Sequence, residues 1–231
     1  MTYIVAGCKS WNRRIFDDVI SRYPGEWHYI RSREELTLKR IQELDPRYIF
    51  FLHWSWQVPD EIVKDYECVC FHMTDVPYGR GGSPLQNLII RGHKDTKLTA
   101  LKMVAELDAG PVYLKEDLSL ENGSAEEIYI RSTSKAAEMI RHIVSEEMEP
   151  VPQKGKPTIF KRRRPEESEI PDVQNLRQLH DFIRMLDAEG YPRAFITKSG
   201  LRFEFSGATL YDERIEADVT ITKVDETRGK P

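Results

Sequence analysis

Short apolar runs alternate with amphipathic segments through the first part of the chain. Buried strands are predicted at residues 3–7, 28–30, 48–52 and 68–71, where apolar side chains follow one another. Between them, residues 10–23, 32–44 and 59–64 favour helices, with Ser10 as a candidate N-cap and Ser32 with Glu35 as a capping-box pattern. This alternation predicts an α/β fold with an open, mostly parallel sheet and helices on both faces.

The pattern changes after residue 148. A long amphipathic helix is expected at residues 126–148, and the prolines and glycine between residues 150 and 157 then predict an extended linker. A further helix is expected at residues 174–187, and strand-like pieces at 193–197, 201–205 and 219–222. We therefore expect a catalytic domain at residues 1–150, a linker at 151–165 and a small β-rich subdomain at 166–231.

Composition narrows the class of protein. No apolar run is long enough to span a bilayer, and three cysteines give no disulfide framework, so we expect a cytoplasmic protein without a membrane segment. The formal net charge of −4 argues against a large nucleic-acid surface. One basic cluster, residues 161–164, precedes two glutamates, and it is either a solvated turn or a phosphate contact. Sequence does not predict the oligomeric state.

Candidate chemistry gathers after the predicted strands. Ligands of open α/β sheets bind at the carboxyl ends of the strands, and Gly7, His53 and His72 each follow a predicted strand. Histidine is suited to proton transfer near neutral pH, and Asp108 lies in a turn that can fold back onto His72. A carboxylate on the other ring nitrogen would fix the tautomer of His72. A lone histidine at a strand end is also compatible with a structural role.

Nine residue identities, with His72 and Asp108 among them, form a recognisable pattern. They are His72, Pro77, Gly81, Pro84, Gln86, Gly92, Thr99, Asp108 and Gly110. In this order they resemble the catalytic core of the formyltetrahydrofolate-dependent N-formyltransferases, over roughly residues 1–165. The loop from His72 to Gln86 and residues 190–195 are similar to the sugar-nucleotide branch, which includes the pseudaminic acid N-formyltransferase.

The resemblance implies a Rossmann-like formyltransferase fold and an enzyme that needs no metal. It implies formyl transfer from N10-formyltetrahydrofolate to an amino-sugar nucleotide, with His72 as the general base and Asp108 orienting it. The folate would contact Trp54, Trp56, Val58 and Asp108. The acceptor would contact Thr74, Tyr78, Gly79, Arg80, Gly81 and Gln86. A nucleic-acid partner is not expected. The alternatives are a methionyl-tRNA formyltransferase and a non-catalytic folate- or nucleotide-binding protein.

One position departs from the family pattern. The asparagine that polarises the formyl carbonyl in the family aligns with Cys70, and a thiol is a weak hydrogen-bond donor. Asn87, Gln86 or protonated His72 are candidates to replace the amide, or the chain is inactive. Cys70 itself is a candidate nucleophile, although a small buried strand residue is the simpler interpretation. Metal binding by Cys68 and Cys70 is disfavoured, because no second ligand pair accompanies them.

Overall fold

A six-stranded sheet forms the centre of the first domain in the computed structural model, which describes residues 1–224; residues 225–231 of the expected subdomain lie outside it. The strand order is β2-β1-β3-β4-β6-β7. The bounds are β1 Thr2–Gly7, β2 Glu26–Ile30, β3 Tyr48–Leu52, β4 Cys68–His72, β6 Asp95–Lys102 and β7 Val112–Ser119. The first four are parallel and the last two antiparallel. The predicted open α/β sheet is confirmed, and β6 and β7 are additions that the sequence pattern did not predict.

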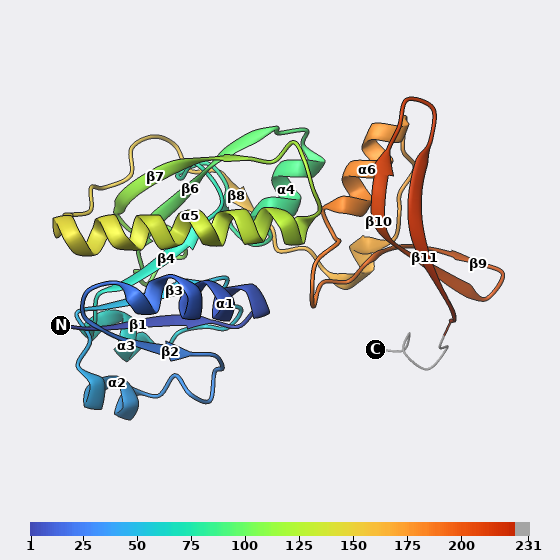
Figure 1. Cartoon of the computed structure of the whole chain (residues 1–231). Coiled ribbons are helices and arrows are strands. Elements are labelled where there is room, and N and C mark those ends of the chain that lie inside the picture. The colour runs from blue at the N-terminus through green and yellow to red at the C-terminus, as the bar shows by residue number, and fades with distance from the viewer. Residues whose placement is uncertain (225–231) are drawn as a thin grey trace.

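Helices cover both faces of this sheet. Helices α1 (Ser10–Asp18) and α5 (Ala125–Glu146) lie side by side on one face, and α2 (Leu38–Leu44) and α3 (Asp60–Asp65) lie on the other (Figure 1). Successive strand residues point to opposite faces. Val5 and Phe50 therefore enter the core under α1 and α5, while Ile4 and Ile49 enter the core under α2 and α3. Burial on both faces explains the uninterrupted apolar runs.

The start of α2 differs from the prediction. The helix begins at Leu38, and its N-cap is Thr37, whose hydroxyl accepts a hydrogen bond from the Arg40 amide at 3.3 Å. Ser32 and Glu35 instead belong to a turn, and the Glu35 carboxylate accepts hydrogen bonds from the Arg31 amide and guanidinium. The prediction that Ser32 and Glu35 begin the helix was therefore wrong. Glu35 bonds to Arg31 instead, and Thr37 caps the helix.

The segment between the two domains, residues 151–165, is joined to the first domain by backbone hydrogen bonds. Its strand β8 (Ile159–Phe160) pairs in parallel with β5 (Arg80–Gly81), and Val151 exchanges two backbone hydrogen bonds of 2.8 Å with Val112. The 3₁₀ turn η2 (Pro165–Ser168) follows this segment, and the short helix α4 (Pro84–Ile90) follows β5. The expected linker is thus a strap across the loops that follow β4 and β6.

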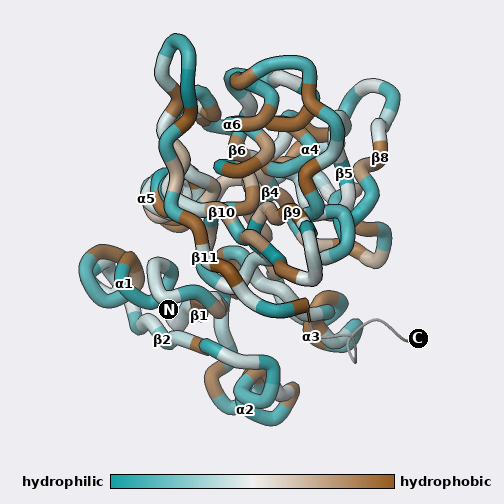
Figure 2. Tube along the Cα trace, turned by 90° about the vertical axis from the view of Figure 1, so that its right-hand side faces the viewer, coloured by the Kyte–Doolittle hydropathy of each residue, from teal (hydrophilic) through white to brown (hydrophobic). Residues whose placement is uncertain are grey.

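The C-terminal subdomain packs one helix against a three-stranded antiparallel sheet. Helix α6 (Leu176–Arg184) contacts β10 (Leu201–Leu210), which lies between β9 (Ala194–Lys198) and β11 (Ile215–Lys223). Figure 2 shows hydrophobic colour along the strands of both domains and hydrophilic colour in many of the outer loops. No helix within residues 1–224 combines the length and apolar character needed to cross a bilayer.

Candidate active site

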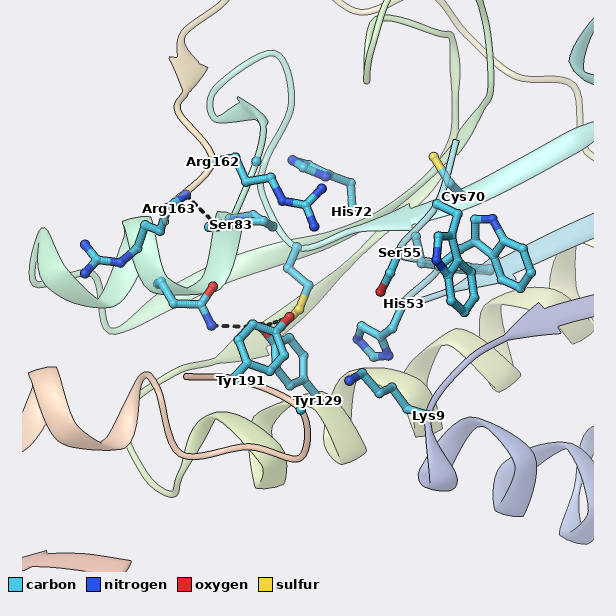
Figure 3. A pocket seen from close by; sticks show the side chains of 18 of the residues that line it. Lys9, His53, Ser55, Cys70, His72, Ser83, Tyr129, Arg162, Arg163 and Tyr191 are labelled. Atoms are coloured by element: carbon cyan, nitrogen blue, oxygen red, sulfur yellow. Dashed lines mark hydrogen bonds between the residues drawn. The ribbon is translucent and has the colours of Figure 1, made fainter. Parts of the chain in front are cut away.

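A cavity of about 630 Å³ lies at the carboxyl ends of β1, β3 and β4. Lys9 approaches it after β1, His53 follows β3, and Cys70 and His72 are on β4 (Figure 3). Asp108 enters from the loop between β6 and β7. The three strands thus bring together residues that are far apart in the sequence, at the edge where open α/β sheets bind ligands.

His72 is held by a backbone carbonyl. Its Nε2 atom lies 2.8 Å from the carbonyl oxygen of Gly79, which only accepts hydrogen bonds, so Nε2 carries the hydrogen. In the neutral ring Nδ1 is then the basic nitrogen, and it lies 3.5 Å from Oδ2 of Asp108. The tautomer is therefore fixed by Gly79, whereas Asp108 lies beside the nitrogen that can take a proton.

Asp108 is fixed in turn by the glycine-rich loop. Its Oδ2 atom accepts a 2.9 Å hydrogen bond from the Gly81 amide, and its backbone is left-handed with φ of 53°. Gly81 has φ of 104°, and a Cβ there would collide with the carbonyl of Phe160. Glycine is required at position 81 for the strap to approach, and this approach aims the amide at the carboxylate.

Cys70 lines the cavity next to this pair. Burial, together with the charge of Asp108, raises the pKa of the Cys70 thiol, which disfavours the thiolate that a nucleophile needs. Cys68 lies on the same face of β4 and is buried, with its thiol 3.6 Å from the carbonyl of Ile62. Residues 1–224 contain no group of three potential metal ligands.

The two amides proposed to replace the family asparagine are occupied. Nδ2 of Asn87 lies within 3.1 Å of the carbonyls of Gly82, Ser83 and Lys161, and Asn87 does not line the cavity. Gln86 lines the cavity, but its Nε2 atom donates to the Tyr129 hydroxyl at 2.9 Å and to the Met185 carbonyl at 3.0 Å. Both amides brace the cavity wall.

The other predicted contacts fall into two groups. Trp54, Trp56 and Val58, which were predicted to contact the folate, line the cavity. Residues of the expected acceptor group lie behind the wall and make internal contacts. These are Thr74 and Gly79 (3.2 Å hydrogen bond), Tyr78 (3.0 Å from Nε2 of His93), Arg80 (bound to Gln153 and Glu106) and Gly81 (bound to Asp108).

A second histidine on the cavity wall was not assigned a role from the sequence. Nδ1 of His53 accepts a 3.3 Å hydrogen bond from Trp11, so Nε2 carries the hydrogen and faces the Ser132 hydroxyl at 3.2 Å. Burial, with a smaller contribution from Lys9, lowers the pKa of His53 to about 4. His53 is therefore neutral at pH 7.

The cavity also has an aromatic stack and a cationic wall. Trp11, Tyr129 and Tyr191 form a stack, with ring centroids 6.0 Å and 5.5 Å apart, and the Lys9 ammonium lies 5.5 Å from the Tyr191 ring (Figure 3). The cations lining the cavity are Lys9, Arg162, Arg163 and Arg164, and Asp108 is the one acidic residue of the described chain that lines it. Sequence spacing gives no signal for this convergence.

The family model described as methionyl-tRNA formyltransferase, C-terminal domain, matches residues 165–222. A solved methionyl-tRNA formyltransferase from Clostridium thermocellum is 44% identical, with a TM-score of 0.91, and the match covers 96% of this chain and 99% of that one.

Other relatives match over a smaller part of the chain or at lower identity. A methionyl-tRNA formyltransferase from Rickettsia prowazekii is 36% identical over 38% of this chain and 30% of its own length. The matched segments span less than two thirds of such curated relatives. A solved sugar N-formyltransferase from a Shewanella species is only 15% identical, with a TM-score of 0.63 over 95% of this chain and 99% of that one. It shows a shared fold.

Two expectations from the sequence are therefore wrong. The chain is much more similar to a methionyl-tRNA formyltransferase than to a sugar N-formyltransferase. The assignment to the sugar-nucleotide branch is therefore wrong, and so is the expected amino-sugar acceptor. The expectation that a nucleic-acid partner is unlikely is also wrong, because the relatives are methionyl-tRNA formyltransferases. It rested on the net charge, which is a sum over the molecule, whereas the cavity carries a local excess of cations. The chain belongs to the methionyl-tRNA formyltransferase family.

Proposed function

We propose that the chain transfers a formyl group from N10-formyltetrahydrofolate to the α-amine of methionyl-tRNA. The observation that carries this proposal is one cavity that joins the His72–Asp108 pair to a cationic wall. Membership of the methionyl-tRNA formyltransferase family supports the same acceptor.

The loop after β3 fits the folate. Trp54 and Trp56 pack edge to face with centroids 5.0 Å apart, and flat aromatic rings suit a flat heterocycle. Val58 adds apolar surface, and Nε1 of Trp54 has no hydrogen-bond partner among the described residues. When bound, the folate supplies a formyl group on nitrogen. Trp54, Trp56 and Val58 would hold it in the cavity.

Proton transfer falls to Nδ1 of His72. Gly79 keeps the hydrogen on Nε2, so Nδ1 is free to remove a proton from the attacking amine. The imidazolium formed in this way lies beside the Asp108 carboxylate, which stabilises the new charge. The same Nδ1 hydrogen is then available to the leaving nitrogen. One residue thus serves as base and acid in turn.

His72 also takes the place of the missing amide donor in this proposal. The thiol of Cys70 is a weak donor, and the amides of Gln86 and Asn87 are already bonded to protein groups. The protonated Nδ1 of His72 is the remaining strong donor of the catalytic pair toward a developing oxyanion. The rate of formyl transfer is therefore expected to be lower than in a site with an amide, because one oxyanion donor contributes a factor of about 10²–10³ to the rate.

The cationic wall is suited to the acceptor. Lys9, Arg162, Arg163 and Arg164 line the cavity, to which the C-terminal subdomain contributes Tyr191. Phosphates of an RNA end would neutralise these cations and release bound counterions. The long aromatic stack beside them offers a surface for the terminal base.

The test compares acceptors. The protein is incubated with N10-formyltetrahydrofolate and either methionyl-tRNA, free methionine or uncharged tRNA, and the gain of one formyl group is measured by mass spectrometry. We expect gain on methionyl-tRNA alone, with a rate that falls as salt is raised. Absence of gain on methionyl-tRNA, with folate bound, would overturn the proposed activity.

A non-catalytic binding protein is the second candidate, and Cys70 in place of the family amide is the observation that favours it. This alternative requires folate affinity without turnover on any amine. It also requires that His72→Ala leaves the folate dissociation constant unchanged and that no product forms with the wild-type chain.

A further inference from the structure

We propose that Gln153, acting with Arg80, is a positioning residue that joins the two loops carrying the catalytic pair. This inference rests on the proposed formyl transfer, in which His72 and Asp108 act together. Gln153 lies on the strap, outside the cavity lining, and neither composition nor motif spacing distinguishes it.

Both the nitrogen and the oxygen of the Gln153 side-chain amide make hydrogen bonds. Its Nε2 atom donates two hydrogen bonds of 2.8 Å, one to the carbonyl of Asp108 and one to the carbonyl of Gly110. Its Oε1 atom accepts from Nε and Nη2 of Arg80, at 3.1 Å and 2.9 Å. One side chain therefore binds the loop of Asp108 through its nitrogen and the glycine-rich loop through its oxygen.

These two loops also meet at the reacting groups. The glycine-rich loop offers the Gly79 carbonyl to Nε2 of His72 and the Gly81 amide to the carboxylate of Asp108. Arg80 stands between these two glycines. Its guanidinium, held by Gln153, fixes the segment that sets both contacts. A shift of this loop would move the partners of His72 and Asp108 together.

Asp108 has a special need for such support. Its left-handed φ of 53° is unfavourable for a residue with a Cβ and persists only when surrounding contacts impose it. The carboxylate is held by Gly81 and the main-chain carbonyl by Gln153. Without Gln153, the backbone carbonyl loses this partner, and Asp108 is held through its carboxylate alone.

Backbone hydrogen bonds hold the strap on both sides of Gln153. On one side, Val151 exchanges two 2.8 Å hydrogen bonds with Val112. On the other, the Arg80 amide donates to the Thr158 carbonyl at 3.0 Å. The strap is thus paired with both loops by backbone bonds, and Gln153 adds the side-chain contact between those pairings.

The variants separate the two halves of the contact. Gln153→Glu keeps an acceptor for Arg80 but removes the donors to Asp108 and Gly110. Arg80→Ala removes the other half, and Gln153→Ala removes both. Gln178→Ala is the matched control, because Gln178 is an exposed glutamine on α6 whose amide oxygen accepts one local hydrogen bond.

Kinetics form the first measurement. We expect Gln153→Ala and Gln153→Glu to lower kcat for formyl transfer by about tenfold to a hundredfold, since small displacements of catalytic groups have effects of this size. The KM for the folate should stay within about threefold, because the folate side of the cavity is untouched. Gln178→Ala should retain wild-type kcat. A kcat unchanged in every variant, after correction for the folded fraction, would overturn the proposal.

Hydrogen exchange supplies a measurement that does not depend on activity. The Gly81 amide donates to the Asp108 carboxylate, whereas its neighbour, the Gly82 amide, donates to the Phe160 carbonyl of the strap at 3.1 Å. We expect Gln153→Ala to speed exchange at Gly81 at least tenfold relative to Gly82. Equal changes at both amides, or none, would show a general structural effect and refute positioning. If the wild-type chain forms no product, the proposed function fails while this arm still decides the role of Gln153.

Discussion

Nε2 of His72 lies 2.8 Å from the carbonyl oxygen of Gly79, and this contact decides which nitrogen of the ring is basic. Because a carbonyl only accepts hydrogen bonds, Nδ1 is left to exchange protons, 3.5 Å from the Asp108 carboxylate. The backbone of the glycine-rich loop thus performs the task of fixing the tautomer, and the carboxylate is free to stabilise the protonated ring.

Replacement of His72 by alanine is expected to lower kcat by about 10²–10⁴, the usual contribution of a general acid–base residue. Folate affinity should remain close to wild type, since the apolar and aromatic wall at Trp54 is intact. Single-turnover formylation of methionyl-tRNA and equilibrium folate binding measure the two quantities. Retention of the wild-type rate would remove His72 from the mechanism.

The substitution Cys70→Asn is expected to keep or raise the rate. Position 70 lines the cavity beside the catalytic pair, and an amide adds a strong donor where the thiol is a weak one. The comparison is kcat for Cys70→Asn against Cys70→Ser, which adds a smaller donor. Complete loss of activity in both variants, with melting temperatures unchanged, would show that the cysteine has a role of its own.

Arg162→Ala tests the cationic wall. Arg162 is exposed, lines the cavity and makes no hydrogen bond or ion pair within residues 1–224. We expect weaker binding of methionyl-tRNA and a slope of log K against log salt that is smaller by about one. Arg214→Ala is the control, because Arg214 is also exposed but does not line the cavity. Identical slopes for wild type and Arg162→Ala would exclude a phosphate contact.

His53 makes stability depend on pH. Burial lowers its pKa from 6.5 to about 4, so between these values the unfolded chain binds a proton that the folded chain does not. The free energy of unfolding should therefore fall as the pH is lowered from about 6.5 to about 4. The variant His53→Gln should show a smaller fall over this interval.

Chemical denaturation at several pH values measures this dependence. His142→Gln, at a half-exposed position of α5, is the matched control and should follow the wild-type curve. If the wild type and His53→Gln lose stability in parallel over this interval, His53 is not the group responsible.

Much of the sheet could be predicted because burial on two faces leaves a clear mark in the sequence. Residues 3–7, 48–52 and 68–71 are apolar without interruption, and they became β1, β3 and β4. Strand β7 escaped prediction because a run of three charged residues, 115–117, interrupts its apolar pattern. The start of α2 was misplaced for a local reason, since Glu35 bonds to Arg31 and Thr37 caps the helix.

The sequence by itself determined the α/β class, the candidates His72 and Asp108, and the place of His72 at the end of a strand, because these follow from local periodicity and from motif order. Only the tertiary structure decided what surrounds them. Asn87 braces a loop, Tyr78 and Arg80 lie behind the cavity wall, and the cations of the strap converge on the cavity with Lys9. Such contacts join residues far apart in the chain, and no periodicity records a contact across that distance.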